Sequence, residues 1–190
     1  TKAEHFGIKN NHFSFSLENM VNRSRQVSKK LSDGIEYLFK KHSIKILKGE
    51  AYIKNPNTIK VTLNDKDELI STKNIIIATG ASPKMPSFLT GKENFIWNYK
   101  DAMLPKQLPK RLGIIGSGAI GIEFASFYND LGSKVSVFEM QDRICPNEDN
   151  DISITLEKIL TKKGIQFFKN SKVRDLIKKE HIQLVSSYND

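Results

Sequence analysis

The chain has 190 residues, 38% of them hydrophobic, and a net charge of +9. No apolar run approaches the ~20 residues that a membrane-spanning helix needs, and the single cysteine, Cys145, excludes an intramolecular disulfide framework. The lysines are scattered among acidic residues, which favours a solvated surface over a nucleic-acid-binding one. We therefore expect a protein that binds neither a membrane nor a nucleic acid.

The first part of the chain predicts a long helix followed by a small sheet. Residues 1–11 are polar and predict an entry loop. Apolar residues then recur at helical spacing from Leu17 to Lys41, which indicates one amphipathic helix. Short segments of alternating apolar and polar residues follow and predict the strands of an antiparallel meander; they are residues 44–48, 51–54 and 59–64.

Residues 74–80 form an almost wholly apolar run that ends in a small-residue turn. Such a run is typical of a strand buried on both faces of a sheet. Residues 82–110 hold most of the prolines and show no periodicity, which indicates an extended linker. The linker suggests two domains, residues 1–104 and residues 105–190.

The second part of the chain alternates strand and helix patterns. This β-α-β-α-β order implies parallel strands joined by helical crossovers, and so an α/β fold of the three-layer, Rossmann-like type. Residues 173–185 predict two further short antiparallel strands. The alternating elements are expected at residues 111–115, 118–131, 134–139, 151–163 and 166–169.

A glycine motif stands where the first of these strands meets its helix. Gly116 would permit the tight turn, Gly118 would let the backbone approach a pyrophosphate, and Gly121 would let helix and strand pack closely. The N-terminus of the helix would then hold the anion. An acidic residue is expected about 20 positions further on, where it binds a ribose, and Glu139 stands there.

Glu139 also bears on the choice of cofactor. A carboxylate accepts hydrogen bonds from two ribose hydroxyls but repels a 2′-phosphate. Residues 140–142 add no basic side chain, and Arg143 comes late. The pattern therefore favours NAD over NADP. The alternative interpretation of the glycine motif is a glycine-rich turn that binds no ligand.

With these motifs in place, the chain resembles the dihydrolipoamide dehydrogenase family of flavoprotein disulfide reductases. The likeness includes the helix from Met20 to Phe39, the Lys-Gly-Glu-Ala sequence at residues 48–51, the Ala-Thr-Gly turn that ends at Gly80, and the stretch from Gly116 to Glu139. It implies an NAD-binding domain at residues 105–190 and part of an FAD-binding domain at residues 1–104.

The resemblance also implies which residues contact each cofactor. Glu123 would lie beside the nicotinamide, and Val173 would lie on the adenine side. Ala51 and Ala81 depart from the family, which usually has Gly and Ser there. The implied NAD contacts are Gly116, Ser117, Gly118, Ala119, Ile120, Gly121, Ile122, Glu123, Glu139 and Val173, and the implied FAD contacts are Ala51, Thr79, Gly80 and Ala81.

In the complete family enzyme, electrons pass from dihydrolipoamide on a lipoyl-bearing partner protein to a cysteine pair, then to FAD and NAD. The resemblance implies a homodimeric parent in a bacterial cytoplasm or a mitochondrial matrix. The family's redox motif CxxxxC, its FAD-binding GxGxxG and its acid–base histidine have no counterpart here, so we expect an internal fragment with no catalytic residue and no activity of its own. Another FAD-dependent reductase of the glutathione or mercuric type, or a non-catalytic NAD-binding module, are the alternatives.

Overall fold

The computed structural model describes residues 14–179 and 182–188. They belong to two compact units, one formed by Asn22–Ser82 and the other by the chain from Pro83 onward together with the residues up to Val21. The division into domains at residues 104 and 105 stays a prediction. Within the described residues, no helix is both long and apolar enough to cross a membrane.

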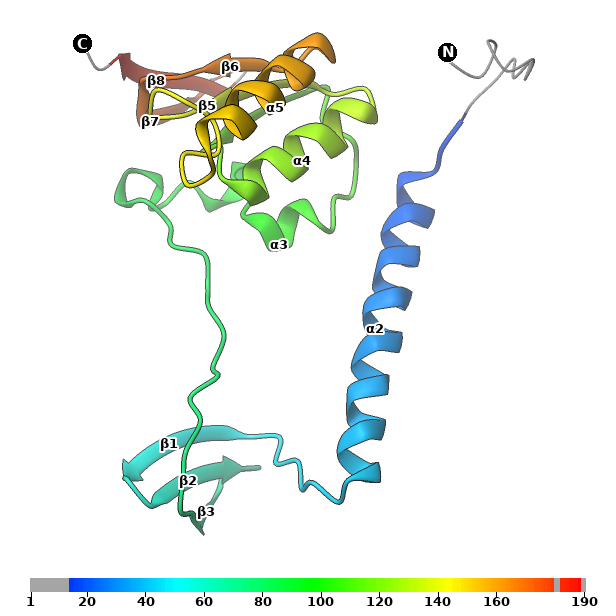
Figure 1. Ribbon diagram of the computed structural model, residues 1–190, viewed down its shortest axis with the longest axis vertical. Coiled ribbons are helices and arrows are strands. Elements are labelled where there is room, and N and C mark those ends of the chain that lie inside the picture. Colours follow the sequence, from blue (N-terminus) through cyan, green and yellow to red (C-terminus); the bar gives the residue numbers. More distant parts are fainter. Residues whose placement is uncertain (1–13, 180–181, 189–190) are drawn as a thin grey trace. The chain divides into compact units, whose positions relative to one another are not determined.

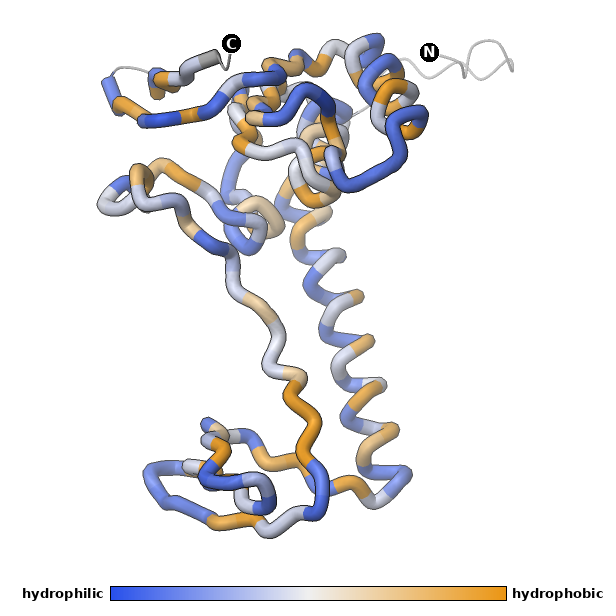
Figure 2. Tube along the Cα trace, turned by 60° about the vertical axis from the view of Figure 1, so that its left-hand side comes forward, coloured by the Kyte–Doolittle hydropathy of each residue, from blue (hydrophilic) through white to orange (hydrophobic). Residues whose placement is uncertain are grey.

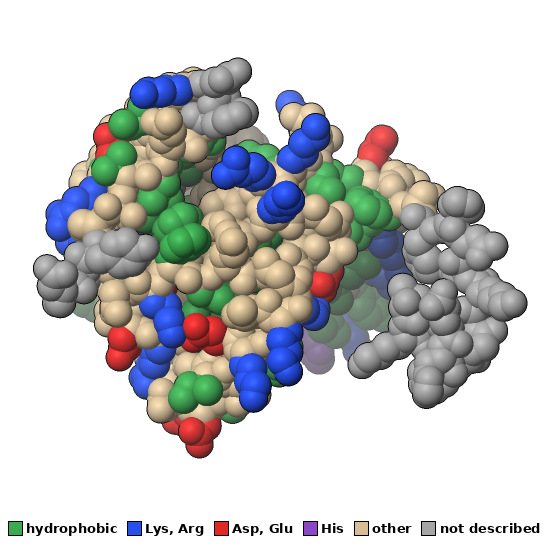
Figure 3. Space-filling view, turned by 90° about the horizontal axis from the view of Figure 1, so that it is seen from above, with side chains coloured by type: hydrophobic (Ala, Val, Ile, Leu, Met, Phe, Trp, Pro, Cys, Tyr) green, Lys and Arg blue, Asp and Glu red, His purple; other side chains and the backbone are tan. Residues whose placement is uncertain are grey.

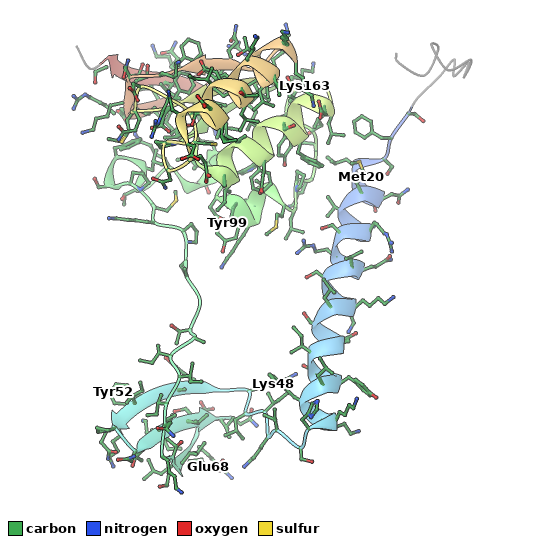
Figure 4. All side chains as sticks on the ribbon, viewed as in Figure 1. Met20, Lys48, Tyr52, Glu68, Tyr99 and Lys163 are labelled. Atoms are coloured by element: carbon green, nitrogen blue, oxygen red, sulfur yellow. The ribbon has the colours of Figure 1, made fainter. Side chains whose placement is uncertain are left out.

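The predicted long helix is confirmed as α2 (Leu17–Lys41). None of its residues is buried, although its apolar side chains repeat at helical spacing; Leu31 is 66% exposed and Ile35 is 54% exposed. After the helix the chain turns back, and the Lys48 ammonium lies 2.7 Å from a carboxylate oxygen of Glu36 (Figure 4). This exposed ion pair links α2 to the segment that leads into the sheet.

The first sheet is the predicted antiparallel meander, but two of its strands differ from the prediction. It consists of β1 (Glu50–Asn55), β2 (Thr58–Leu63) and β3 (Lys66–Ser71), in that order (Figure 1). The prediction of a strand at residues 44–48 was wrong, and the third strand follows the second instead.

Backbone geometry explains both differences. The ladder with β2 begins at Glu50, next to Gly49, whose Cβ position lies 2.3 Å from the Thr62 carbonyl oxygen and so excludes a larger residue. At the other end of β2, Asn64 and Asp65 both have positive φ, 47° and 61°. A two-residue turn of this kind reverses the chain directly into a hairpin.

The prediction of a buried strand at residues 74–80 was also wrong. The segment is extended but belongs to no sheet; Ile76 is 91% exposed and Ile77 is 71% exposed. Figure 2 shows it as a hydrophobic stretch leading out of the meander. A strand buried on both faces needs paired neighbours, and no described strand pairs with this one.

The linker contains three short helical turns before the second sheet begins. They are η1 (Ser87–Leu89), η2 (Glu93–Phe95) and α3 (Tyr99–Ala102). Asn98 and Asp101 form a capping box at the start of α3. The Asn98 side chain accepts from the Lys100 N–H, and the Asp101 carboxylate accepts from the Asn98 N–H. The hydroxyl of Tyr128 donates to the Ala102 carbonyl over 2.7 Å, which ties α3 to the following domain core.

The second sheet confirms the predicted β-α-β-α-β order. Its parallel strands lie in the order β4-β5-β6, and Ile115 pairs with Phe138 at the carboxyl end of the first pair. The predicted helices and strands are all present within a few residues of their expected bounds. They are β4 (Arg111–Ile115), α4 (Ala119–Asp130), β5 (Lys134–Phe138), α5 (Asn150–Lys162) and β6 (Gln166–Phe168).

Alternation along β5 gives this sheet two apolar faces. Val135 and Val137 are buried against Tyr128 of α4 and Leu160 of α5, while Phe138 packs on the opposite side. There it meets a second cluster formed in part by β7 (Ser171–Lys178), which pairs antiparallel with β8 (Ile182–Tyr188). The result is the expected three layers: helices, parallel sheet and antiparallel hairpin (Figure 1).

Basic side chains are visible on the face shown in Figure 3. On this face, Lys and Arg form several separate groups, with hydrophobic, acidic and uncharged side chains between them.

Candidate dinucleotide-binding site

The glycine motif forms the turn from β4 into α4. Gly116 has a φ of +96°, in the left-handed region where a side chain would be strained. Its N–H donates to the Phe138 carbonyl over 2.8 Å, which joins the turn to the end of β5. The first glycine therefore has the conformational role that the motif predicts.

Gly121 lies where the helix crosses the turn. A Cβ at this position would lie 2.2 Å from the Gly116 carbonyl oxygen, 3.3 Å from the Gly116 carbonyl carbon and 3.4 Å from Cγ2 of Ile114. The helix can approach the strand this closely only because residue 121 has no side chain. The close-packing role expected of the third glycine is what the structure shows.

Gly118 is the N-cap of α4, and neither its conformation nor its described neighbours require a glycine. Its φ of −65° and ψ of 175° are open to any residue, and its Cβ position meets open space. Gly118 provides no side-chain cap to the first turn. A helix N-terminus without a capping side chain, next to open space, is an arrangement that can bind a phosphate.

Glu139 follows β5 directly and turns its carboxylate toward the glycine turn. Its Oε2 accepts from the Ser117 N–H over 2.9 Å and from the Ser117 hydroxyl over 2.7 Å. Its Oε1 accepts from the Gln141 N–H over 2.9 Å. Glu139 as a whole residue is 6% exposed and lies at the carboxyl end of the parallel strands, where ligands bind in folds of this kind.

The hydrogen bonds keep this buried carboxylate ionised. Burial alone would raise the pKa of Glu139, but the Ser117 hydroxyl and the N–H groups of Gln141, Ser117 and Met140 stabilise the charged form and bring its pKa below the usual value. A negative charge at this position suits ribose hydroxyls, which donate, and opposes a 2′-phosphate.

The loop that contains Cys145 is hydrogen-bonded to the glycine turn. The Cys145 N–H donates to the Ser117 carbonyl over 2.9 Å, and the Ser153 hydroxyl of α5 donates to the Cys145 carbonyl over 3.3 Å. Cys145 is buried with a φ of 44°. Burial, with the nearby Glu148 and Glu139 carboxylates, raises the pKa of its thiol. The cysteine is therefore a structural residue here and a poor nucleophile.

The remaining predicted NAD contacts lie in three settings. Ala119, Ile120 and Glu123 are exposed in the first turns of α4, on the side away from the core. Ile122 is buried in the core beneath the helix, so only its backbone is near the turn. Val173 is 6% exposed and packs with Leu89 and Leu176 in the second apolar cluster. Their roles toward NAD stay predictions.

The four predicted FAD contacts do not form a cradle in the described residues. Ala51 is exposed in β1 and pairs with Val61 of β2. Thr79, Gly80 and Ala81 are exposed in chain without regular structure, where Gly80 has a φ of +75°. Their role toward FAD rests on the resemblance and stays a prediction.

Sequence reasoning missed how Ser117 and Cys145 contribute. Ser117 was expected only as part of the pyrophosphate turn, and Cys145 was given no role near it. The sequence carries a weak signal for the first: a hydroxyl residue directly after a glycine, 22 positions before an acidic residue at the next strand end. Nothing in the sequence indicates the second contact, because residues 140–149 have no regular pattern.

The chain belongs to the pyridine nucleotide-disulphide oxidoreductase family, whose sequence pattern matches residues 3–189. It is 35% identical over 175 residues to a dihydrolipoyl dehydrogenase from Zymomonas mobilis, an alignment that covers 92% of this chain and 38% of that protein. It is 40% identical over 169 residues to a dihydrolipoyl dehydrogenase from Rhizobium etli, covering 81% of this chain and 35% of that protein.

Solved structures show the same fold. LpdA from Mycobacterium tuberculosis superposes with a TM-score of 0.84 at 24% identity, covering 98% of this chain and 41% of that one. A copper(II) complex of the C43S mutant of the flavoprotein disulfide reductase RclA from Escherichia coli gives 0.78 at 25% identity, covering 90% and 40%. The chain thus spans well under half the length of these relatives.

Proposed function

We propose that this chain is the nicotinamide-binding part, with a portion of the flavin-binding part, of an NAD-dependent dihydrolipoyl dehydrogenase. The observation that carries the proposal is the carboxylate of Glu139, turned toward a glycine turn whose helix N-terminus is uncapped. Family membership and the names of the relatives support the reaction class. The expected cofactors are NAD and FAD.

Within this proposal each group of residues has a defined task toward NAD. The first-turn N–H groups of α4 would bind the pyrophosphate, and Gly118 leaves the space for it. Glu139 would accept the hydroxyls of the adenosine ribose. Glu123, exposed one helical turn further, would face the nicotinamide. NAD supplies the hydride-accepting chemistry when bound, and the chain's own residues bind and orient it.

The proposals for substrate, partners and location rest on the resemblance to the family and on the relatives' names. We propose dihydrolipoamide on a lipoyl-bearing protein as the substrate, and a homodimeric parent in a bacterial cytoplasm or a mitochondrial matrix. Bacterial and mitochondrial dihydrolipoyl dehydrogenases both occur among the relatives. The use of FAD also rests on the family alone.

Ligand-observed NMR with NADH and NADPH tests the nucleotide site, because it detects the weak, rapidly exchanging binding expected of an isolated part of an enzyme. We expect stronger saturation transfer to NADH than to NADPH, and the adenosine ribose protons among those most affected. Equal signals from both nucleotides, or a preference for NADPH, would contradict the role of Glu139. Absence of a signal from either nucleotide would contradict the role of the α4 N-terminus as a pyrophosphate site.

An activity assay tests whether this chain can react with a dithiol by itself. The only cysteine of the 190 residues is buried, so the chain offers no cysteine pair to a dithiol. We therefore expect no reduction of NAD by dihydrolipoamide with this chain alone. Measurable turnover would show that the electron path proposed from the family does not apply.

A further inference from the structure

Ser117 is fully buried and bonds to Glu139 through two different donors. Its N–H and its hydroxyl both donate to Oε2 of the carboxylate, over 2.9 and 2.7 Å. The shorter of the two is within the range of a strong bond to an ionised acceptor. The residue between the first two glycines is therefore fixed to the carboxylate at the next strand end, 22 positions later.

The peptide of Ser117 is itself held from the other side. Its carbonyl accepts from the Cys145 N–H over 2.9 Å, and Cys145 is in turn bonded to Ser153 of α5 and to the Glu148 N–H. Gly116, directly before it, is fixed to Phe138. Ser117 thus has little freedom to move, and a hydroxyl on a fixed backbone can define where its acceptor lies.

Among the residues that the structure describes, Ser117 alone offers Glu139 a side-chain donor, and the other bonds come from main-chain N–H groups. A carboxylate bonded only to its own following backbone keeps its charge but can still rotate about its terminal torsion, which is broad. The Ser117 N–H holds one oxygen, Oε2, and the hydroxyl adds a second, shorter bond to that same oxygen, which restricts the rotation further. The other oxygen, Oε1, carries a bond only from the chain's own next residues.

We propose that Ser117 is a positioning residue that sets the orientation of the Glu139 carboxylate for the adenosine ribose and so supports selection of NAD over NADP. This inference rests on the proposed function, since it concerns the same nucleotide site. Ser117 acts through Glu139 and contacts no reacting atom. Orientation of an acceptor before binding improves affinity because the ligand need not impose it.

The test compares Ser117→Ala with a matched buried serine. Ser133 is 3% exposed, donates its hydroxyl to the Pro109 carbonyl over 2.6 Å and precedes β5, at the opposite end of the strand from Glu139. Ser133→Ala therefore removes a similar bond away from the site. Ser117→Thr keeps the hydroxyl. Thermal melts of all three variants identify any that fail to fold.

We expect Ser117→Ala to weaken NADH binding by about five- to tenfold, which is within the net effect of one ordinary hydrogen bond. NADPH binding should change by less than about twofold, so the ratio of the two affinities falls. Ser133→Ala should leave both affinities unchanged, and Ser117→Thr should restore much of the NADH binding if it folds. In a Glu139→Gln background, Ser117→Ala should have no further effect on the ratio.

The outcomes separate this inference from the proposed function. Equal loss of NADH and NADPH binding, or additive effects of the two substitutions, would overturn the positioning role and indicate a general effect on the turn. Tighter NADH binding by Ser117→Ala would also overturn it, because the hydroxyl would then compete with the ribose. If the wild-type chain binds neither nucleotide, the proposed function itself fails and the positioning role fails with it.

Discussion

Substitution of Gly121 gives the sharpest test of why the motif needs its third glycine. An added Cβ would lie 2.2 Å from the Gly116 carbonyl oxygen, whereas ordinary contact begins at 3.4 Å. The two atoms would have to move apart by 3.4 − 2.2 Å, about 1.2 Å. Only a shift of the backbone can provide this distance, because the Gly116 oxygen is a main-chain atom and the new Cβ is bonded to the main chain. Gly121→Ala should therefore force α4 away from the end of β4 or deform the turn.

The expected loss of stability can be estimated. Overpacking costs about 1–3 kcal/mol, and a clash against backbone belongs at the upper end, about 3 kcal/mol. Replacing a helical glycine by alanine returns about 1 kcal/mol of helix propensity. The net loss is about 2 kcal/mol, which for a domain of about 100 residues lowers the melting temperature by about 8–16 °C. Circular dichroism during heating and urea titration both measure it.

Gly118→Ala is the matched control, because the same atom is added three residues away. Its Cβ meets nothing within 4 Å and its φ is negative. The N-cap preference for glycine over alanine costs at most about 1 kcal/mol, so this variant should fold almost normally and lose nucleotide binding. Equal melting temperatures for Gly121→Ala and the wild type, or a larger loss from Gly118→Ala, would refute the reasoning.

Three further predictions concern single side chains. The pKa of Glu139 in the folded chain lies below its ordinary value of 4.5. The ionised carboxylate therefore stabilises the folded chain above pH 4.5, and this stabilisation is lost as the pH falls through the lower folded pKa. Glu139→Gln should flatten the acid side of a curve of stability against pH, and an unchanged curve would contradict the stabilising role of the hydrogen bonds. Cys145 is buried with a raised pKa, so an aromatic disulfide reagent at pH 8 should react slowly until urea is added; rapid reaction with the native chain would contradict its burial. Tyr128→Phe leaves the Ala102 carbonyl without its 2.7 Å donor, and should cost about 1–3 kcal/mol in urea unfolding; a neutral effect would mean that water replaces the bond.

The second sheet could be predicted because its signals are local. Each strand and helix between Arg111 and Phe168 has its own periodicity, and the glycines with Glu139 identify the turn that joins them. The first sheet was predicted in kind but not in register. The strand predicted at residues 59–64 includes Asn64, whereas Asn64 and Asp65 are two left-handed residues in succession and make the tight turn of a hairpin.

Other features depend on contacts that no local pattern contains. A run such as residues 74–80 has the composition of a buried strand, yet composition does not supply the neighbours that bury it. The bond from the Ser117 hydroxyl to Glu139 joins residues 22 positions apart and depends on a rotamer. The support that Cys145 gives to the turn comes from a loop without periodicity, so only coordinates could reveal it.

The extended segment around Ile76 and Ile77 has a practical consequence for anyone who handles this chain. Consecutive β-branched residues with exposed side chains, in a conformation already suited to pairing, are the template on which separate molecules add strands to one another. Concentrated solutions should thus be prone to sheet-like assembly from this point. A lysine in place of one isoleucine would interrupt that growth, since natural proteins protect such edges with charge.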